Sequence, residues 1–273
     1  MDYFEYPVPD EARPHGICLW RFAVEAKDPE AFVHVVPPDG TVTLSASLYP
    51  GQEPRLTTTG ASVRAHLVPV VHGMSAAGIR LRPGVAPDLL SVPAATLVGA
   101  MTPWVPEGSQ VALAEAMVAM ARDEDAWVEA GRVFGAVARE LASPDPLVAQ
   151  LVDRLLAEPD LGGVGVAMEA VPIGVRQLRR RFLAATGLSP KSFAQMQRLR
   201  HACILALENP PRNWSQVAAE AGFSDQAHFS RQVARTFGVS PTVLMEYLRT
   251  IRHQLVPQVG QDRRQDDRFL QDS

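Results

Sequence analysis

The chain has 273 residues, a formal net charge of −4 and 47% hydrophobic residues, a length that fits about two domains. Its two cysteines, Cys18 and Cys203, lie far apart and outside any Cys-x-x-Cys or Cys/His cluster, which argues against a structural zinc site, and we predict no cofactor. The acidic N-terminus lacks the apolar run of a signal peptide, and no segment approaches the roughly 20 apolar residues of a membrane span, so we expect a soluble, cytoplasmic protein without a membrane partner.

The charge is unevenly distributed along the chain. Residues 1–149 hold 10 Lys and Arg against 18 Asp and Glu, whereas residues 150–254 hold 13 against 8. A basic C-terminal block behind an acidic N-terminal one is typical of a protein that binds nucleic acid through its C-terminal part alone.

Short apolar segments with β-branched residues recur between residues 15 and 105. Turn-forming Pro and Gly residues at 37–40, 50–51 and 83–84 divide them. Short strands at regular spacing, separated by such turn residues, predict an antiparallel barrel or sandwich. The expected strands cover residues 17–24, 31–36, 42–48, 63–71 and 78–81.

A small barrel of this kind can enclose a ligand. Polar groups facing inward, together with aromatic walls, would contact it, and six residues are candidates for this role: Trp20, Tyr49, Arg55, His66, His72 and Arg80. A metal-dependent enzyme in such a barrel would need a His-x-His pair, a carboxylate and a further His. No His-x-His occurs in the chain, so we predict neither a metal site nor catalytic residues.

Residues 109–158 have the apolar periodicity of helices, with breaks near residues 122–125 and at residues 144–146. This helical hairpin could pack within its own domain, form a homodimer or couple two domains, and all three roles remain open. We place the domain boundary at the second break, giving residues 1–145 to the first domain and residues 146–256 to the second. Residues 257–273 are rich in Gln, Asp and Arg and predict a disordered tail.

Arginines cluster early in the second domain. Arg176, Arg179 and Arg180 lie within about one helical turn and can share a helix face. Because Arg pairs bidentately with guanine and also binds phosphate, this face predicts contact with DNA, a solvated basic face being the alternative. The Gly-rich residues 162–165 lack the third small residue and the flanking strand of a dinucleotide fingerprint, and we predict a loop there.

Residues 213–244 have the spacing of two helices joined by a tight turn. Asn213 can cap the first helix, and Gly222 supplies the backbone freedom that the turn needs. Ser224 is the predicted N-cap of the second helix, whose buried side carries Phe229 and Val233. A helix, a tight turn and a second helix that begins with polar groups together predict a helix-turn-helix.

The same module occurs upstream at an offset of 51 residues. The matching pairs are Leu178 and Phe229, Arg180 and Arg231, Gly187 and Gly238, and Pro190 and Pro241. Internal duplication predicts two related units, and the helical spacing of apolar residues over 191–207 predicts one helix between them. Two helix-turn-helices on one rigid helix would enter successive major-groove faces on the same side of the duplex.

Residues 213–244 resemble, almost position by position, the second helix-turn-helix of the AraC/XylS family of bacterial transcription regulators. The residues that carry the resemblance are Ala218, Gly222, Phe223, Phe229, Ser230, Arg231, Phe237, Gly238, Ser240 and Pro241. The connecting segment is similar to the family's linker helix at Arg198 and Ala202. The first unit departs from the pattern, with Met168, Pro172 and Gly174 where the family has a small residue, a turn Gly and a Ser N-cap.

Residues 34–40 and 78–84 resemble, more loosely, the cupin-like sensory domain attached to many regulators of this family. The resemblance implies an α+β protein: an antiparallel β-barrel with helices, followed by an all-α DNA-binding domain with two helix-turn-helices. It also implies that the first domain senses a small molecule or forms a dimer.

The second recognition helix would contribute Gln226, His228 and Arg231 to the DNA interface. The amide of Gln226 suits adenine, and Arg231 suits guanine or phosphate. His228 could reach a phosphate or a base edge or could simply be solvated. Asp225 is expected to support the helix N-terminus electrostatically.

These observations lead to a sequence-specific, DNA-binding transcription regulator, not an enzyme, that is modulated by a small molecule in its N-terminal domain. The expected partners are promoter DNA, a small-molecule effector, a second copy of the chain and, for an activator, RNA polymerase. The alternative is an assembly protein with a decayed first helix-turn-helix that acts as an anti-activator. The effector, the operator and the sign of regulation stay open.

Overall fold

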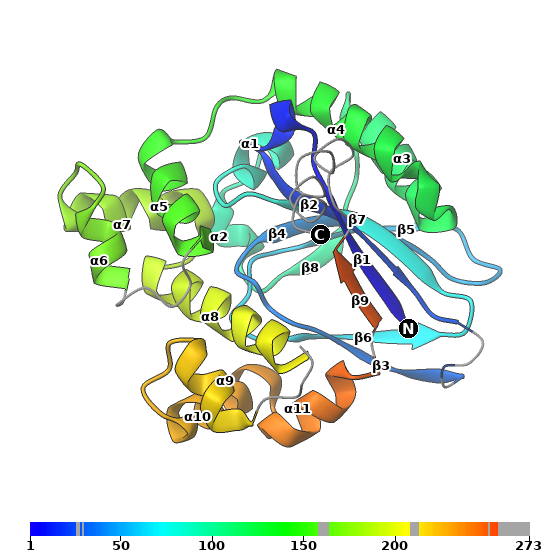
Figure 1. Ribbon diagram of the computed structural model, residues 1–273. Coiled ribbons are helices and arrows are strands. Elements are labelled where there is room, and N and C mark those ends of the chain that lie inside the picture. The colour runs from blue at the N-terminus through cyan, green and yellow to red at the C-terminus, as the bar shows by residue number, and fades with distance from the viewer. Residues whose placement is uncertain (26–27, 29, 158–163, 208–212, 251, 256–273) are drawn as a thin grey trace, which may run out of the picture.

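The computed structural model describes residues 1–25, 28, 30–157, 164–207 and 213–250, and the backbone of residues 252–255. Two β-sheets and their covering helices form the N-terminal half, and a run of helices follows (Figure 1). The predicted α+β class, with an antiparallel sheet ahead of a helical domain, is confirmed.

The main sheet has the strand order β8-β5-β4-β7-β2-β1-β9. Neighbouring strands are antiparallel except β9, which pairs in parallel with β1. The bounds of the strands are β1 Asp2–Pro7, β2 Gly16–Ala23, β4 Val42–Leu48, β5 Arg55–Thr59, β7 Ser75–Leu81, β8 Met101–Pro103 and β9 Arg252–Leu255.

The prediction of a closed barrel is wrong. Strands β3 (Ala31–Val36) and β6 (His66–Val71) pair with each other in a separate sheet of two strands and do not close the main sheet. Pro69 gives one physical reason, because its missing N–H group is typical of a strand at a sheet edge. The result is an open sheet with a hairpin standing opposite one of its faces.

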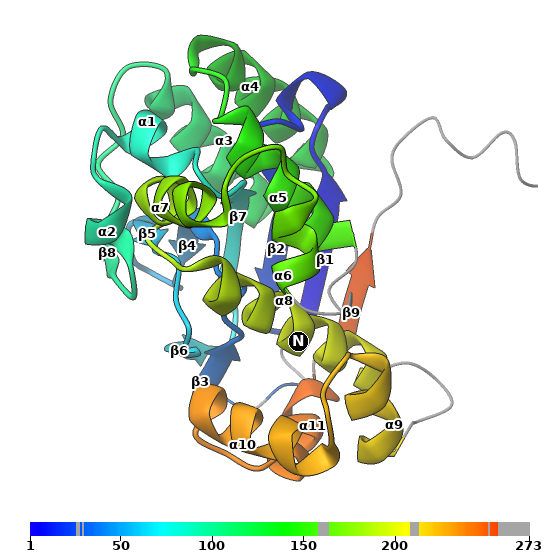
Figure 2. The same cartoon turned by 90° about the vertical axis from the view of Figure 1, so that its left-hand side faces the viewer.

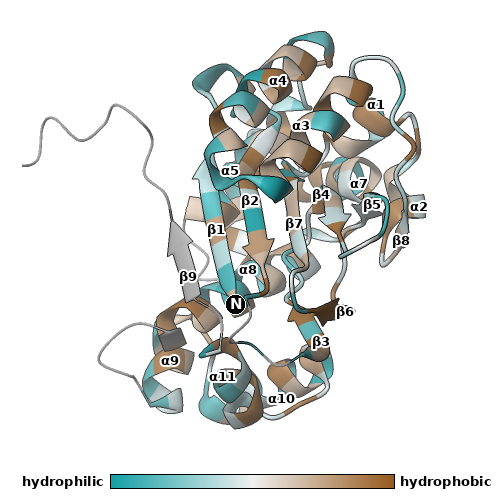
Figure 3. Cartoon of the chain, turned by 90° about the vertical axis from the view of Figure 1, so that its right-hand side faces the viewer, coloured by the Kyte–Doolittle hydropathy of each residue, from teal (hydrophilic) through white to brown (hydrophobic). Residues whose placement is uncertain are grey.

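Helices α3 (Gln110–Arg122) and α4 (Trp127–Glu140) cover the other face of the main sheet. Both helices carry hydrophobic and hydrophilic residues side by side, as amphipathic helices do (Figure 3). Their apolar sides meet the inward residues of the strands in one core that includes Leu44, Ile79, Met117 and Phe134, each 0% exposed. Short helices α1 (Ala86–Leu90) and α2 (Ala94–Leu97) lie in the connection from β7 to β8.

The helical half contains two separate apolar cores. Its helices are α5 Pro146–Ala157, α6 Val164–Glu169, α7 Val175–Thr186, α8 Pro190–Leu207, α9 Trp214–Glu220, α10 Gln226–Phe237 and α11 Pro241–Leu248. Helix α8 contributes Phe193 to the first core and Leu199 to the second, and it lies between the two groups of helices (Figure 2). The predicted connecting helix is therefore present, one residue longer at its start.

Three expectations for the helical half have different outcomes. The predicted loop at residues 162–165 is wrong for its second half, since α6 begins at Val164. The domain boundary stays a prediction, although α5 begins at Pro146, where the second domain is expected to start. The predicted tail at residues 257–273 lies outside the described residues.

None of the helices in the described part of the chain is both long and apolar enough to cross a lipid bilayer.

Candidate functional site

The second helix-turn-helix forms from short-range signals. Asn213 caps α9, with its side chain accepting from the Gln216 N–H while the Gln216 side chain accepts from the Asn213 N–H. The chain turns at Gly222, whose φ of +73° lies in the left-handed region that favours glycine. Asp225, not Ser224 as predicted, is the N-cap of α10, and its carboxylate accepts from the His228 N–H at 2.5 Å. That hydrogen bond lowers the pKa of Asp225.

Helix α10 separates an apolar side from a polar one. Phe229 and Val233 are 1% and 0% exposed and belong to the core of the second unit. Gln226 and Arg231 lie exposed on the other side. Gln226 accepts a hydrogen bond from the hydroxyl of Ser215 on α9, at 2.8 Å, and this contact orients the amide at the start of the helix.

His228 is less available than its predicted neighbours. It is half-buried, and its Nδ1 lies 3.1 Å from the hydroxyl of Ser224. Its ring also contacts the ring of Phe223, with centroids 5.5 Å apart. The structure therefore brings His228 to the start of α10 beside Gln226, but with its ring against the turn.

The first unit forms despite its unusual turn. Gly174 is the N-cap of α7 without a side-chain hydrogen bond, and Leu178 and Phe182 are both 0% exposed in the core of this unit. Arg176, Arg179 and Arg180 are all exposed. The three arginines therefore form the exposed basic face that the sequence predicts.

The two units end alike, as the 51-residue offset predicts. Gly187 and Gly238 are the C-caps of α7 and α10, with φ of 73° and 74°. Each donates its N–H to the carbonyl four residues earlier, on Leu183 and Ala234. Helix α8 contacts the turn of the second unit through Arg198, whose guanidinium donates to the Gly222 carbonyl at 3.3 Å.

A cavity of about 440 Å³ lies between the inner face of the main sheet, the β3–β6 hairpin and helices α8 and α11. Five of the six predicted contact residues line it: Trp20, Tyr49, Arg55, His66 and Arg80. The inward position predicted for His72 is wrong. His72 follows the last residue of β6, and its Nε2 contacts the carbonyl of Asp28.

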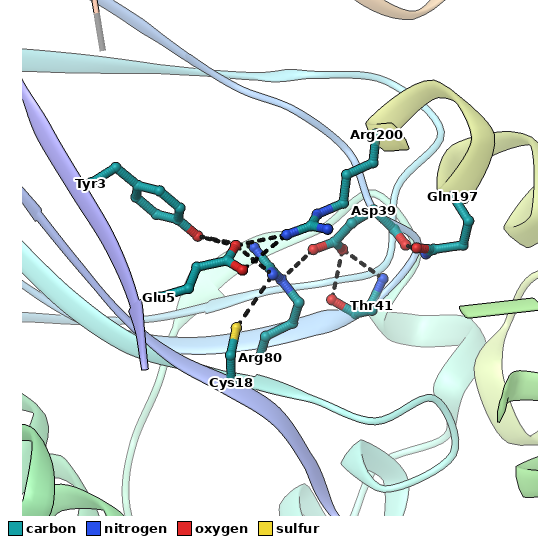
Figure 4. Close-up of polar contacts among 8 residues, drawn as sticks. All are labelled: Tyr3, Glu5, Cys18, Asp39, Thr41, Arg80, Gln197 and Arg200. Carbon is teal, nitrogen blue, oxygen red and sulfur yellow. Dashed lines mark hydrogen bonds and ion pairs between the residues drawn. The ribbon is translucent and has the colours of Figure 1, made fainter. Parts of the chain in front are cut away.

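A charged cluster, Glu5, Asp39, Arg80 and Arg200, forms one end of the cavity (Figure 4). Arg80 pairs with Glu5 at 3.0 Å and with Asp39 at 2.5 Å. Arg200, from α8, donates to both carboxylate oxygens of Glu5, at 2.8 and 3.0 Å. The cluster therefore ties the main sheet to the helix that connects the two helix-turn-helices.

The electrostatics of the cluster fix its charge states. Burial alone would raise the pKa of Glu5, but the adjacent Arg80 and Arg200 guanidinium groups hold it well below its usual range. Cys18 lies beside Arg80, with 3.3 Å between Nη1 and Sγ, and burial raises the pKa of its thiol to about 12. Glu5 is therefore a carboxylate and Cys18 a neutral thiol at physiological pH.

Further contacts join the two halves around the cavity. The Tyr247 hydroxyl on α11 accepts from the Val35 N–H at 2.8 Å and contacts His34 Nδ1. Gln197 on α8 donates to the Asp39 carbonyl at 2.5 Å. A change in the cavity can therefore be transmitted to α8 and α11, the helices that precede and follow the second helix-turn-helix.

The contact between His34 and Tyr247 predicts acid sensitivity. Because the Tyr247 oxygen already accepts from Val35, its proton is directed to His34 Nδ1, which must be unprotonated. Burial lowers the pKa of His34 to about 4, against about 6.5 in an unfolded chain. Between these values the unfolded state binds more protons, so stability falls as pH drops from about 6.5 to 4, by about 3 kcal/mol in total.

Denaturant unfolding at pH 7, 5 and 4 measures this effect. The variant His34→Gln keeps a hydrogen-bonding side chain that does not titrate, so its stability should decline less over the same range. An equal decline in both proteins would show that His34 does not carry the acid sensitivity.

Several site residues escaped the sequence prediction. Glu5, Asp39 and Arg200 come from β1, the β3–β4 connection and α8, and no local pattern connects them. The inward hydroxyls of β4 and β5 were detectable in principle, because Thr43, Ser45 and Ser47 alternate with apolar residues in the run Val-Thr-Leu-Ser-Ala-Ser-Leu.

The family match lies in the helical half, and the sequence match covers about a third of the chain. A helix-turn-helix domain family matches residues 168–250. The curated HTH-type transcriptional regulator MtrA of Neisseria gonorrhoeae is 31% identical over 98 residues, which are 36% of this chain and 32% of that relative. The chain thus spans about a third of the length of the curated relative that it matches.

Two solved structures are similar at lower levels of identity. The DNA-binding domain of AdpA, in complex with a target DNA, is 24% identical, with a TM-score of 0.35 over 39% of this chain and 95% of that chain. An apo variant of ToxT from Vibrio cholerae is 12% identical, with a TM-score of 0.46 over 84% of this chain and 97% of that chain.

Proposed function

Residues 168–250 form a helix-turn-helix domain of the AraC type, and on this premise we propose that the protein is a transcription regulator. It reads promoter DNA through α7 and α10 and responds to a small molecule in its cavity. One observation carries the proposal most directly. In both units the apolar side of the second helix is buried, while polar and basic residues cover its outer side. A helix with this division suits insertion into a major groove.

The roles of the two recognition helices differ. Gln226 and Arg231 at the start and middle of α10 suit bidentate contacts with adenine and guanine. Arg176, Arg179 and Arg180 on α7 supply positive charge that suits phosphate as well as guanine. We assign specificity mainly to α10, and to α7 a larger share of the affinity.

The position of the cavity supports regulation by a ligand. Its lining includes Arg200 and Ile204 of α8 and Leu248 of α11, together with residues of both sheets. A molecule in the cavity would contact the sensory half and the DNA-binding half at once. It would shift the DNA-binding equilibrium by the difference between its affinities for the two arrangements of these halves.

The structure favours regulation over the alternative of an assembly protein with a decayed first unit. Pro172 and Gly174 alter the turn, but α7 is a full helix of 12 residues with Leu178 and Phe182 in its core. Catalysis is not part of the proposal, since the relative with a curated description is a transcriptional regulator. Homodimer formation and contact with RNA polymerase remain parts of the proposed function that DNA-bound complexes would test.

Selection of bound sequences from a random DNA library would give the operator, and gel-shift titration on that operator would test the reading residues. Arg231→Ala and Arg180→Ala should each weaken binding about 10- to 100-fold, as the loss of about 1–3 kcal/mol from a bidentate base contact implies. Thermal unfolding should be nearly unchanged, because both side chains are exposed.

Arg132→Ala is the matched control. Arg132 is also an exposed helical arginine, but it lies on α4 and pairs with Glu129 at 2.6 Å. Its replacement should leave DNA binding as it is.

The affinity of the native protein for DNA should also fall steeply with salt, because phosphate neutralisation releases counterions. Unchanged affinity in both the Arg231 and the Arg180 variant would contradict the proposal.

A further inference from the structure

The inner face of the main sheet divides into a hydroxyl side and an aromatic side. Strands β4 and β5 direct a hydroxyl row into the cavity, made of Thr43, Ser45, Ser47, Thr57 and Thr59. Strand β2 directs Trp20 and Phe22 into it. Because Ser45 pairs with Gly78 of β7, and Gly78 with Trp20, the row and the indole lie at the same level of the sheet.

The indole of Trp20 lies across Gly78. A Cβ at position 78 would stand 2.7 Å from Trp20 Cζ2 and 2.5 Å from the Leu44 carbonyl oxygen, so only glycine leaves room for the ring there. The ring of Tyr3 stacks beside the indole, with centroids 6.2 Å apart and planes inclined by 29°. Since one face of the indole covers the strand, the other face is directed into the cavity that Trp20 lines.

Polar groups around this platform have unused bonding capacity. Within the described part of the chain, the hydroxyls of Thr43, Ser47, Thr57 and Thr59 contact no hydrogen-bonding partner, and Ser45 makes a long bond of 3.4 Å to the Thr57 carbonyl. The buried Nε2 of His66 also has no partner among the described residues. A buried polar group is normally paired, so His66 Nε2 is suited to a ligand with hydroxyl or carbonyl functions, and the half-buried hydroxyls that line the cavity are accessible to the same ligand.

The charges in the interior of the cavity balance. Glu5 and Asp39 neutralise Arg80 and Arg200 within the charged cluster. Burial lowers the pKa of both His34 and His66, so neither imidazole adds positive charge at neutral pH. Arg55 lies outside this balance, on the exposed rim, where its guanidinium stands 4.9 Å from the Tyr49 ring centroid.

This balance decides between neutral and anionic ligands. A carboxylate that enters the interior must lose its hydration, and the guanidinium groups of Arg80 and Arg200 that could compensate it are already paired with Glu5 and Asp39. It would have to displace one of these carboxylates or remain uncompensated. A neutral ligand meets neither cost and gains the stacking and hydrogen bonds that the sheet offers.

We propose that the cavity binds an uncharged, planar ring compound that stacks on Trp20 and hydrogen-bonds through hydroxyl or carbonyl groups to the hydroxyl row and His66. This assignment names the ligand class for the regulatory site of the proposed function and rests on that function for its biological meaning. Binding of the ligand to the cavity does not require DNA, so experiments can contradict the ligand class and the proposed function separately.

Isothermal titration of the full chain at pH 7 tests the assignment with two probes of the same ring size, 2-naphthol and 2-naphthoate. Native protein should bind the naphthol at least 10-fold more tightly than the naphthoate. Trp20→Leu should weaken naphthol binding about 10-fold or more through the lost stacking. The double variant Ser45→Ala/Thr57→Val should weaken it by a similar factor through the lost hydroxyls.

Glu5→Gln provides the decisive reversal. It keeps the shape of the side chain, but it leaves one positive charge of the cluster uncompensated. Naphthoate affinity should then rise at least 10-fold while naphthol affinity changes little. Arg132→Gln, on α4 at the other face of the main sheet, is the control, and it should leave the preference for the neutral probe as it is.

Four outcomes would overturn the assignment: tighter or equal binding of naphthoate by native protein, no binding of either probe, unchanged naphthol binding by Trp20→Leu, or no gain of naphthoate binding by a folded Glu5→Gln. Thermal unfolding of each variant establishes that it is folded, and if Glu5→Gln is not, the native preference and the Trp20 variant still decide. Operator binding measured without probe is a separate result, so a protein that binds naphthol but no DNA would contradict only the proposed function.

Discussion

Replacing Phe229 by alanine is expected to unfold the second helix-turn-helix. Phe229 is 1% exposed and packs against the rings of Trp214 and Phe223, with centroid distances of 5.3 and 5.2 Å. Truncation of a buried phenylalanine costs about 3–5 kcal/mol, because it removes apolar contact and leaves a cavity. That cost is a large part of the roughly 5–15 kcal/mol that stabilises a typical domain. Guanidinium unfolding followed by tryptophan fluorescence would measure it, since Trp214 reports on this core.

The consequence for DNA is expected to be the loss of one half-site. Without its core, α10 cannot hold Gln226 and Arg231 in a groove, so affinity for the selected operator should fall about 100-fold or more, towards non-specific binding. Footprinting should show protection lost at one end of the operator and weakened at the other. Phe229→Leu, which keeps most of the volume, should retain the full footprint with a small loss of stability.

Leu178→Ala is the matched experiment on the first unit. Leu178 occupies the position equivalent to Phe229 at the 51-residue offset and is 0% exposed. Its truncation should cost about 2–5 kcal/mol and remove protection at the opposite half-site. A footprint that covers one half-site in the native protein and stays unchanged in Leu178→Ala would instead favour the assembly protein with one working reader. Normal operator binding by an unfolded second unit would contradict the assignment of α10 as a reader.

The recognition units could be predicted because their signals are local. The cap at Asn213, the turn at Gly222 and the C-caps at Gly187 and Gly238 each depend on hydrogen bonds that span no more than a few residues. The error at the N-cap of α10 is a single residue and has a physical reason. Ser224 and Asp225 are both good caps, and the carboxylate of Asp225, next to the helix start, accepts the His228 N–H.

The sheet was predicted less well because its closure depends on pairing between distant strands. The apolar segments predict β2, β3, β4 and β6 nearly as found, only the second half of β7, and neither β5 nor β8, and nothing in them excludes a barrel. Strand β1 lies in the acidic start of the chain, and β9 lies beside it from the other end, parallel to it. Such long-range partners leave no short-range pattern in either segment.

The residues that line the cavity likewise divide into those that a local pattern predicts and those that only long-range contacts bring there. Arg80 is predicted as one of the polar residues that face into a ligand-enclosing barrel, and the alternation of β4 could have indicated the hydroxyl row. The pairing of Glu5 with Arg200 joins residues 195 positions apart and follows only from the docking of α8 on the sheet. His72 was misplaced because it follows the end of β6, where the alternation of inward and outward side chains stops.

Glu5→Ala is expected to loosen the attachment of α8 to the sheet. The Glu5 side chain is 10% exposed and neutralises Arg80 at 13% and Arg200 at 30% exposure. Removing one partner of a buried ion pair costs about 3–5 kcal/mol, because it leaves an uncompensated charge. We expect a value near the lower limit, about 3 kcal/mol, since Arg80 keeps Asp39 and Arg200 can regain water.

The pH dependence distinguishes the ion pair from simple loss of packing. Because the folded-state pKa of Glu5 lies well below its unfolded value of about 4.3, its contribution to stability is present above that pH and is lost as the pH falls below it. The difference in unfolding free energy between native protein and Glu5→Ala should therefore shrink in acid. A double-mutant cycle with Arg200→Met isolates the bond to α8: the sum of the two single destabilisations should exceed the destabilisation of the double variant by about 1 kcal/mol or more. A pH-independent difference, together with strictly additive effects, would show that Glu5 acts by packing alone and that the halves are held by the contacts of Gln197 and Tyr247.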